Sequence, residues 1–385
     1  MRQKFARVLG GIAVLALTVG AAACKSDSAD GGDGGECGYK IAFFGALTGP
    51  AAGLGINENN GVKLAVHQYN EANPDCKVEL VSMDSQGSPD QAPGLAQKAI
   101  DDTKILGVVG PAFSGESEAA NPAFAEAGLV HVTASATRTS LSSEGWKTFF
   151  RVVGNDQSQA PAAAWYIKDV LKAEKVFVID DQTAYGTGLA DAIKEALGSA
   201  VVASDKVESD GKQNDFSATI TKIKSSGATA VYFGGYYPEA GLIRKQMTAA
   251  GVTAVMISDD GAKDDTFVEI AGTAAEGTIV TCPCAPAEEA RGNFVEEFKK
   301  LHNGTEPGTY SDAAYDAANI LLAGIKEGKK TRPEMLDFVK NYNGEGVSAK
   351  YKFTETGELD PAEVKIWIYK VEGGKIVPVQ EAPKS

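Results

Sequence analysis

The chain has 385 residues, of which 43% are hydrophobic and 23% are charged, and its formal net charge at pH 7 is −14. This length favours two domains over a single core. A surface this acidic repels phosphate groups, which argues against a nucleic-acid-binding protein and against a basic patch on an anionic membrane.

Residues 1–23 have the pattern of a secretory signal peptide. Basic residues precede an apolar run at 8–19, which is shorter than the ~20 residues that a spanning helix needs. Three alanines then precede Cys24, which resembles a bacterial lipoprotein box and predicts a lipid on this cysteine. The alternative is an ordinary secretory cleavage site with an unmodified Cys24. Residues 24–37, rich in Gly, Ser and Asp, predict a flexible tether, so we expect a protein held at the outer face of the cell membrane by lipid alone.

Four further cysteines, an even number in an exported chain, are typical of disulfides. Cys37 and Cys76 each precede an expected strand and can face each other at one edge of a sheet. Cys282 and Cys284 would then pair with each other or stay as thiols. A metal site needs more ligands, and none of the three His lies near these cysteines in the sequence, so we expect neither a metal nor a cofactor.

Strands and helices alternate along the chain from residue 39. A first series has strands expected at 39–44, 77–83, 105–109 and 149–153, helices at 57–71, 91–103 and 115–126, and a further strand after the last helix. A second series has strands expected at 175–180, 200–206, 230–233, 254–258 and 278–282, with helices at 157–171, 188–197, 216–225 and 238–250. The remainder predicts helices at 287–302, 311–327 and 331–342, then strands at 349–354 and 363–371. This alternation predicts an α/β protein with two doubly wound parallel sheets, one in each of two lobes.

Hydroxyl side chains follow the strands of the first series. Ser114 comes after the strand at 105–109 and opens a helix, and Ser135 and Thr137 come after the next strand. Ligands bind at the carboxyl edge of such sheets, and a helix N-terminus favours an anion. These three residues therefore predict a site for a carboxylate.

The strands of the second series end near Tyr185, Tyr236 and Asp260. A single carboxylate suits an ammonium group, and two tyrosines offer apolar walls with polar tips. Each residue alone is more often a cap or a packing residue, but all six fall at one sheet edge. Together they predict a cleft that holds both charged ends of an amino acid.

Enzyme motifs are absent from the sequence. It has no G-x-S-x-G elbow, no H-E-x-x-H pair and no phosphate-binding G-x-x-x-x-G-K-[ST] loop. The acidic pair Asp259 and Asp260 leaves a hydrolase as an alternative, although such pairs at strand ends are usually solvated turns. We expect a binding protein without catalytic residues.

Four segments resemble the periplasmic binding proteins for leucine, isoleucine and valine, which supply ATP-driven importers. They are G-A-L-T-G-P at 45–50, D-x-x-x-Y-G-x-G-L-A at 181–190, D-F-S at 215–217 and Y-x-G-G-Y-x-P-E at 232–239. The resemblance runs from residue 39 to about residue 371. It implies a type I periplasmic binding protein, with a three-crossover hinge and a ligand cleft between the lobes.

The resemblance also implies roles for the site residues. Ser114 and Thr137, with backbone near Ser135, would hold the ligand's carboxylate. Asp260 and the Ser135 carbonyl group would hold its ammonium group. Tyr236 would lie nearby, and the ring of Tyr185 would close from the second lobe.

Three positions depart from the family pattern. Leu54 stands where the family has an aromatic ring, Asp260 replaces a glutamate, and Glu116 is more polar than the small hydroxyl residue expected there. A shorter acid and a lost ring change the size and reach of the pocket. The grip on the amino-acid backbone is therefore better supported than a leucine-type side-chain pocket.

The implied lobes are discontinuous: residues 38–155 with 284–360, and residues 156–283 with 361–385. The implied function is capture of a branched-chain or similar small amino acid and its delivery to the permease subunits of an ABC transporter. The alternatives are the same fold binding an amide, urea or an aromatic acid, and a ligand-sensing domain that signals without transport.

Overall fold

The computed structural model describes residues 38–209, 211 and 213–384. The expected signal peptide, Cys24, the tether and Cys37 lie outside these residues. Among the helices that are described, none is long and apolar enough to cross a membrane. The same residues contain no cluster of His, Cys, Asp or Glu able to hold a metal ion.

The first sheet has five strands in the order β2-β1-β3-β4-β5, and all of its pairings are parallel. Its strands are β1 (Lys40–Gly45), β2 (Glu79–Asp84), β3 (Ile105–Val109), β4 (His131–Thr133) and β5 (Phe149–Arg151). Helices cover both faces, so the central strands are apolar throughout rather than alternating. Phe44 packs on one face with the helix residue Phe124, and Phe43 packs on the other in a core that includes Val62 and Leu321. We call this sheet and its helices the first lobe.

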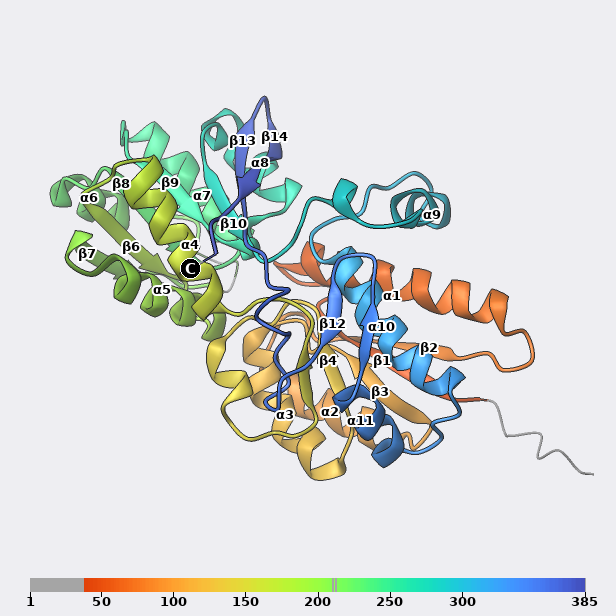
Figure 1. Ribbon diagram of the computed structural model, residues 1–385. Helices are drawn as coiled ribbons and strands as arrows, with labels where there is room; N and C mark the ends of the chain where they lie inside the picture. Colours follow the sequence, from red (N-terminus) through yellow and green to blue (C-terminus); the bar gives the residue numbers. More distant parts are fainter. Residues whose placement is uncertain (1–37, 210, 212, 385) are drawn as a thin grey trace, which may run out of the picture. The chain divides into compact units, whose positions relative to one another are not determined.

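Helices of the first lobe come from two separate parts of the chain. They are α1 (Ala52–Ala72), α2 (Ala92–Asp101) and α3 (Ser114–Ala127), followed later by α9 (Phe294–Leu301), α10 (Ser311–Lys326) and α11 (Arg332–Lys340). Although far apart in sequence, α1 and α10 lie side by side (Figure 1). A small hairpin of β11 (Asn343–Glu345) and β12 (Lys350–Lys352) follows α11.

The second sheet has seven strands in the order β14-β13-β10-β9-β8-β6-β7. They are β6 (Val176–Asp180), β7 (Val201–Lys206), β8 (Ala230–Gly234), β9 (Val255–Ser258), β10 (Ile279–Cys282), β13 (Trp367–Glu372) and β14 (Lys375–Glu381). β6 to β10 are parallel, whereas β13 pairs antiparallel with β10, and β14 antiparallel with β13. The sheet is therefore parallel except at this edge, where the C-terminal strands form an antiparallel hairpin.

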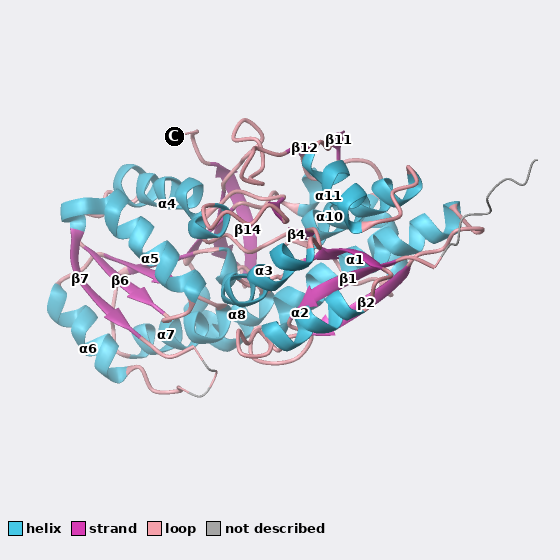
Figure 2. Ribbon diagram, turned by 90° about the horizontal axis from the view of Figure 1, so that it is seen from below, coloured by secondary structure: helices cyan, strands magenta, loops and turns pink. Residues whose placement is uncertain are grey.

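Helices of the second lobe surround this sheet (Figure 2). They are α4 (Asp156–Trp165), continued by a π-helical turn at Tyr166–Val170, α5 (Ala184–Leu197), α6 (Ser217–Ser226), α7 (Tyr237–Ala249) and α8 (Asp265–Ala271). The chain passes between the sheets three times: between β5 and β6, between β10 and β11, and between β12 and β13. The fold is thus two α/β lobes joined by three crossovers, as the resemblance to the family implies.

Several expected boundaries are wrong. The helix expected at 287–302 is a single 3-10 turn, Ala287–Glu289, followed by the short helix α9. Gly292, with φ of 71°, separates the two, because a left-handed residue cannot continue a helix. The last expected strand begins only at Trp367, and β11 and β14 were not predicted.

The second crossover carries the pair Cys282 and Cys284. Their Sγ atoms lie 1.98 Å apart, and their Cα atoms lie 5.0 Å apart. Cys282 is the last residue of β10, and the Cys284 carbonyl oxygen accepts a 2.8 Å hydrogen bond from the Tyr369 hydroxyl group. This crossover is therefore attached to the hairpin strand β13.

Candidate functional site

A buried cavity lies between the two lobes, at the carboxyl ends of their strands. It is lined by Leu54, Glu58, Ala112, Phe113, Ser114, Ser135, Tyr185, Tyr236, Asp260, Gly261 and Tyr310. Six of the seven binding residues that the sequence predicts are in this set, and Thr137 is not. The free volume is about 20 Å³, room for roughly one water molecule. The lobes are therefore closed on each other around the cavity.

The first lobe contributes two serines. Ser114 is the first residue of α3, and its Oγ accepts a 3.3 Å hydrogen bond from the Arg138 backbone N–H. The Ser135 hydroxyl group donates to the Ala112 carbonyl oxygen at 2.6 Å. Thr137 is buried just beyond, with no partner for its Oγ1, and its carbonyl oxygen accepts from the Asp156 N–H at 2.9 Å. Thr137 thus joins the loop that follows β4 to the first residue of α4 in the second lobe.

Glu116 lies in the first turn of α3 but does not line the cavity. Its carboxyl oxygens accept hydrogen bonds from the Ser85 hydroxyl group and from the Phe113 backbone N–H. This is the carboxylate half of a capping box. Burial raises the pKa of Glu116 to about 8. The departure from the family pattern at Glu116 therefore lies outside the cavity, where its carboxyl group caps the start of the helix.

The second lobe contributes Asp260, which is 2% exposed. Its Oδ1 accepts a hydrogen bond from the Tyr185 hydroxyl group at 2.9 Å, and its Oδ2 accepts one from the Tyr310 hydroxyl group at 2.8 Å. The Tyr185 oxygen in turn accepts from the Gly261 N–H at 2.9 Å. Burial raises the pKa of Asp260, and the hydrogen bonds from these tyrosines oppose that shift. An ammonium group beside Asp260 would favour the ionised carboxylate further.

Aromatic rings form one wall of the cavity. The ring of Tyr236 lies 5.0 Å from that of Tyr185 and 5.2 Å from that of Phe113, measured between centroids. Phe113 belongs to the first lobe and the two tyrosines to the second. The wall therefore forms only when the lobes are together.

Tyr310 was not predicted as a site residue. It precedes α10 in the first lobe and has a φ of 65°, a conformation that bulky residues rarely adopt. Such strain persists where the surrounding structure holds it, and it concentrates at functional sites. The sequence offered one signal, an aromatic hydroxyl residue directly before the expected helix at 311–327. Nothing in the sequence predicts the left-handed backbone conformation of Tyr310.

Other polar contacts cross between the lobes around the cavity. The Gly53 N–H donates to the Tyr237 hydroxyl group at 3.1 Å. The Thr309 hydroxyl group donates to the Lys263 carbonyl oxygen. On a different flank, the Arg138 guanidinium donates to the Ala184 carbonyl oxygen and, at 3.3 Å, to Thr187 Oγ1. These contacts hold the lobes closed.

The acidic pair Asp259 and Asp260 does not face the cavity together. Only Asp260 lines it. Asp259 is fully buried, its Oδ2 accepts from the Gly235 N–H at 3.3 Å, and burial raises its pKa well above the ordinary value. The adjacent carboxyl groups of Asp259 and Asp260 therefore do not both reach the cavity.

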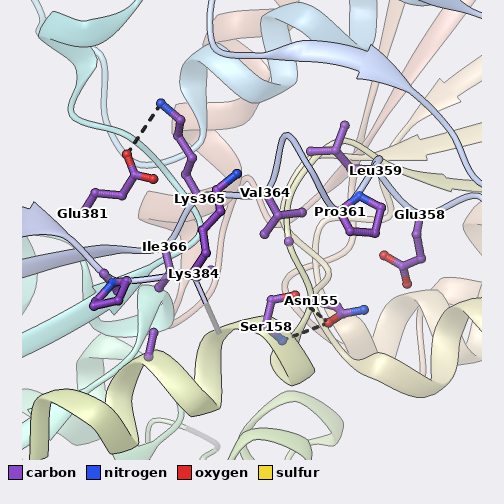
Figure 3. Close-up of a pocket in the computed structure, with 14 residues that line it drawn as sticks. Asn155, Ser158, Glu358, Leu359, Pro361, Val364, Lys365, Ile366, Glu381 and Lys384 are labelled. Carbon is purple, nitrogen blue, oxygen red and sulfur yellow. Dashed lines mark hydrogen bonds and ion pairs between the residues drawn. The ribbon is translucent and has the colours of Figure 1, made fainter.

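A larger hollow lies elsewhere, beside the first and third crossovers (Figure 3). Asn155 and Ser158 at the start of α4 face Glu358 and Pro361 across it. Lys365 and Glu381 form an ion pair of 3.6 Å at its far side. No predicted binding residue lines this hollow, so it belongs to the crossover region rather than to the cavity between the lobes.

Comparison with known proteins identifies the family. A family model described as "Periplasmic binding protein" matches residues 38–375. The chain belongs to the periplasmic binding protein family. This periplasmic binding protein is 31% identical over 324 residues to the leucine-, isoleucine-, valine-, threonine-, and alanine-binding protein of Pseudomonas aeruginosa, covering 83% of the chain and 87% of the relative. It is 30% identical to the leucine-specific-binding protein of Salmonella typhimurium, covering 98% of the chain and 100% of the relative.

Solved structures show the same fold. A leucine-binding protein from Thermotoga maritima superposes with a TM-score of 0.81 at 28% identity, covering 89% of this periplasmic binding protein and 98% of that structure. A branched-chain amino acid transporter substrate-binding protein from Streptococcus pneumoniae, in complex with isoleucine, gives 0.81 at 26% identity, with 90% and 99% covered. The expected fold class and family are confirmed.

Proposed function

We propose that this chain is the extracytoplasmic substrate-binding protein of an ABC importer and captures a branched-chain or similar small amino acid in the cavity between its lobes. One observation carries the proposal. Asp260 of the second lobe lies in the same cavity as Ser114 of the first, at the N-terminus of α3. An acid and a helix N-terminus are complementary to an ammonium and a carboxylate group, respectively.

In this proposal Ser114 and Thr137, with backbone near Ser135, hold the carboxylate. Asp260 and the Ser135 carbonyl group hold the ammonium. Thr137 does not line the closed cavity, so its side chain would have to turn towards the ligand in order to donate a hydrogen bond.

The apolar part of the ligand would lie against the remaining walls. Leu54 and the rings of Tyr185 and Tyr236 line the same cavity. Tyr310 would complete the ammonium site by holding Asp260 from the other lobe.

The names of the relatives support an amino-acid ligand. Those of Pseudomonas aeruginosa and Salmonella typhimurium are named for leucine and other small amino acids, and the Streptococcus pneumoniae structure holds isoleucine. Asp260, an acid in the cavity that accepts two hydrogen bonds, favours a ligand with an ammonium group over one whose only charge is a carboxylate, such as an aromatic acid.

Domain boundaries near residues 155, 283 and 360 would place the hinge at the three crossovers. Opening there admits the ligand, because the closed cavity has room for about one water molecule. Closure would then present both lobes to the permease subunits.

The N-terminal features belong to the same proposal. A signal peptide at 1–23 would direct export and then be removed. A lipid on Cys24 and the tether would keep the protein beside its permease at the outer face of the membrane. Pairing of Cys37 with Cys76, and of Cys282 with Cys284, suits that oxidising compartment. Mass spectrometry of protein from membranes, with and without reduction, tests the removal of the signal peptide, the lipid and the disulfides.

Calorimetric titration of the purified protein with the twenty amino acids, urea, simple amides and benzoate tests the ligand class. Binding of at least one amino acid, abolished by Asp260→Asn, is expected. An Asp260→Asn variant that binds with unchanged affinity would refute the ammonium site. Failure of every amino acid to bind would refute the function.

A further inference from the structure

Glu58 is a buried acid in the cavity that no assigned role uses. It lies in α1 of the first lobe, is 0% exposed and lines the cavity. Neither of its carboxyl oxygens has a hydrogen-bond partner, whereas both oxygens of Asp260 have one. A carboxyl group buried without a partner destabilises the protein, because it has lost its hydrogen bonds to water and gained none in return.

The surroundings of Glu58 do not supply that partner. Ser135 lowers the pKa of Glu58, but the Ser135 hydroxyl group donates to the Ala112 carbonyl oxygen. Burial has the larger effect and raises the pKa of Glu58 to about 8. The residues that line the cavity include no Lys, Arg or His.

Glu58 and Asp260 both lie near Tyr310. Burial raises the pKa of the Tyr310 hydroxyl group most, and the two acids raise it further; this hydroxyl group donates to Asp260. The cavity is therefore lined by two acids, one from each lobe, and by Tyr310. A zwitterionic aliphatic ligand has one ammonium group, and pairing it with Asp260 leaves Glu58 without a partner.

We propose that Glu58 reads the ligand's side chain by pairing with a hydrogen-bond donor on it. The preferred ligand is then a small amino acid with a side-chain hydroxyl or amide group rather than a purely aliphatic one. This inference rests on the proposed function and narrows its ligand class. A site with a buried polar group that must form a hydrogen bond to the ligand discriminates strongly against an analogue that lacks the matching donor or acceptor.

Pairs of ligands with nearly equal shape test the inference. Threonine and valine differ by one hydroxyl group in place of a methyl group, and asparagine is close in shape to leucine. Calorimetric titration of the wild type at pH 7 should give at least one pair in which the polar ligand binds about tenfold more tightly or better, since a hydrogen bond to a carboxyl group is worth that much. An affinity ratio of polar to apolar ligand below about tenfold in both pairs, or a preference for valine and leucine, overturns the inference.

Variants assign the preference to Glu58. Glu58→Leu should reduce the ratio of the affinity for the polar ligand to that for its apolar analogue to below about threefold, because only the polar ligand loses a partner. Glu58→Gln should keep part of this preference, since an amide still forms hydrogen bonds. Glu116→Leu is the matched control. Glu116 is also a buried glutamate whose pKa is raised to about 8, but it lies outside the cavity, so this variant should keep the wild-type affinity ratio. An unchanged ratio in Glu58→Leu overturns the inference. If that variant does not fold, the wild-type ratio and the Glu58→Gln variant decide.

The outcomes separate this inference from the function on which it rests. Preferred binding of leucine or valine, abolished by Asp260→Asn, would leave the proposed function intact and refute only the role of Glu58. Absence of binding by every amino acid would refute both.

Discussion

The Tyr310 hydroxyl group donates a 2.8 Å hydrogen bond to Oδ2 of Asp260, and this contact joins the first lobe to the second inside the binding cavity. Tyr310 precedes α10 in a left-handed conformation, and Asp260 follows β9. Closing the lobes therefore completes the hydrogen bonding of the acid proposed to hold the ligand's ammonium group. In the proposed function, this contact would help to couple ligand binding to closure of the lobes.

Tyr310→Phe removes this hydrogen bond and keeps the ring. We expect the amino-acid ligand to bind about tenfold more weakly, because one oxygen of a buried carboxylate loses its partner. Calorimetric titration with the best ligand from the screen measures the change.

Tyr351→Phe is the matched control for this variant. The Tyr351 hydroxyl group donates to Asp316 Oδ2 at the same 2.8 Å, and it is also buried, but both residues belong to the first lobe. It should lower the thermal stability and leave the ligand affinity unchanged. Equal affinity losses in the two variants would show that the Tyr310 contact has no special part in binding.

Arg138→Ala should loosen the closed state. Its guanidinium group reaches Ala184 and Thr187 at the start of α5 and also pairs with Glu118 on α3 at 2.6 Å. Loss of these contacts should raise the ligand dissociation rate severalfold in stopped-flow experiments, because most affinity changes in related complexes are in that rate. Arg244→Ala, which loses a contact to Glu276 within the second lobe, should not change it.

Gly261→Ala should disturb the ammonium site directly. A Cβ atom there would lie 2.7 Å from Cε1 of Tyr185 and 2.6 Å from the Gly235 carbonyl oxygen, so the ring or the backbone must move. We expect a ligand affinity at least about tenfold lower, since Tyr185 would no longer meet Asp260. Gly94→Ala in α2 has open space and should bind ligand normally, with a gain in stability of about 0.5–1 kcal/mol.

The sequence predicted the lobes well because their strands are buried on both faces. Continuous apolar runs such as 105–109 and 176–180 leave little doubt about a parallel sheet. The C-terminal hairpin was predicted poorly, since β14 has exposed, mixed side chains and only its pairing with β13 makes it a strand. Local pattern does not determine such an edge strand.

The residues of the cavity also divide into those that the sequence could predict and those that it could not. Residues at strand exits, such as Ser114 and Asp260, could be predicted because parallel strands bring their carboxyl ends to one edge. Glu58 and Tyr310 could not, because one lies within a helix and the other reaches the cavity only after the chain crosses back to the first lobe. Thr137 has the right position in sequence, but its side chain does not line the closed cavity.

The buried Glu116 makes stability depend on pH in a direction that can be measured. Its pKa rises from an ordinary value of 4.5 to about 8 in the folded protein because of burial. Between these values the unfolded chain binds fewer protons than the folded one, so stability falls as pH rises and levels off above about pH 8.

Glu116→Gln removes this contribution, because an amide can replace the protonated carboxyl group without titrating. Between pH 5 and 8 the melting temperature of the ligand-free variant should therefore fall less steeply than that of the wild type, by about 2 °C per pH unit. Other buried acids with raised pKa values, such as Asp181 at about 7, should leave some decline in both proteins. Glu126→Gln, at an exposed position on the same helix, should follow the wild-type curve. Parallel curves for wild type and Glu116→Gln would mean that Glu116 is ionised in the folded protein at pH 7, against the direction that its burial requires.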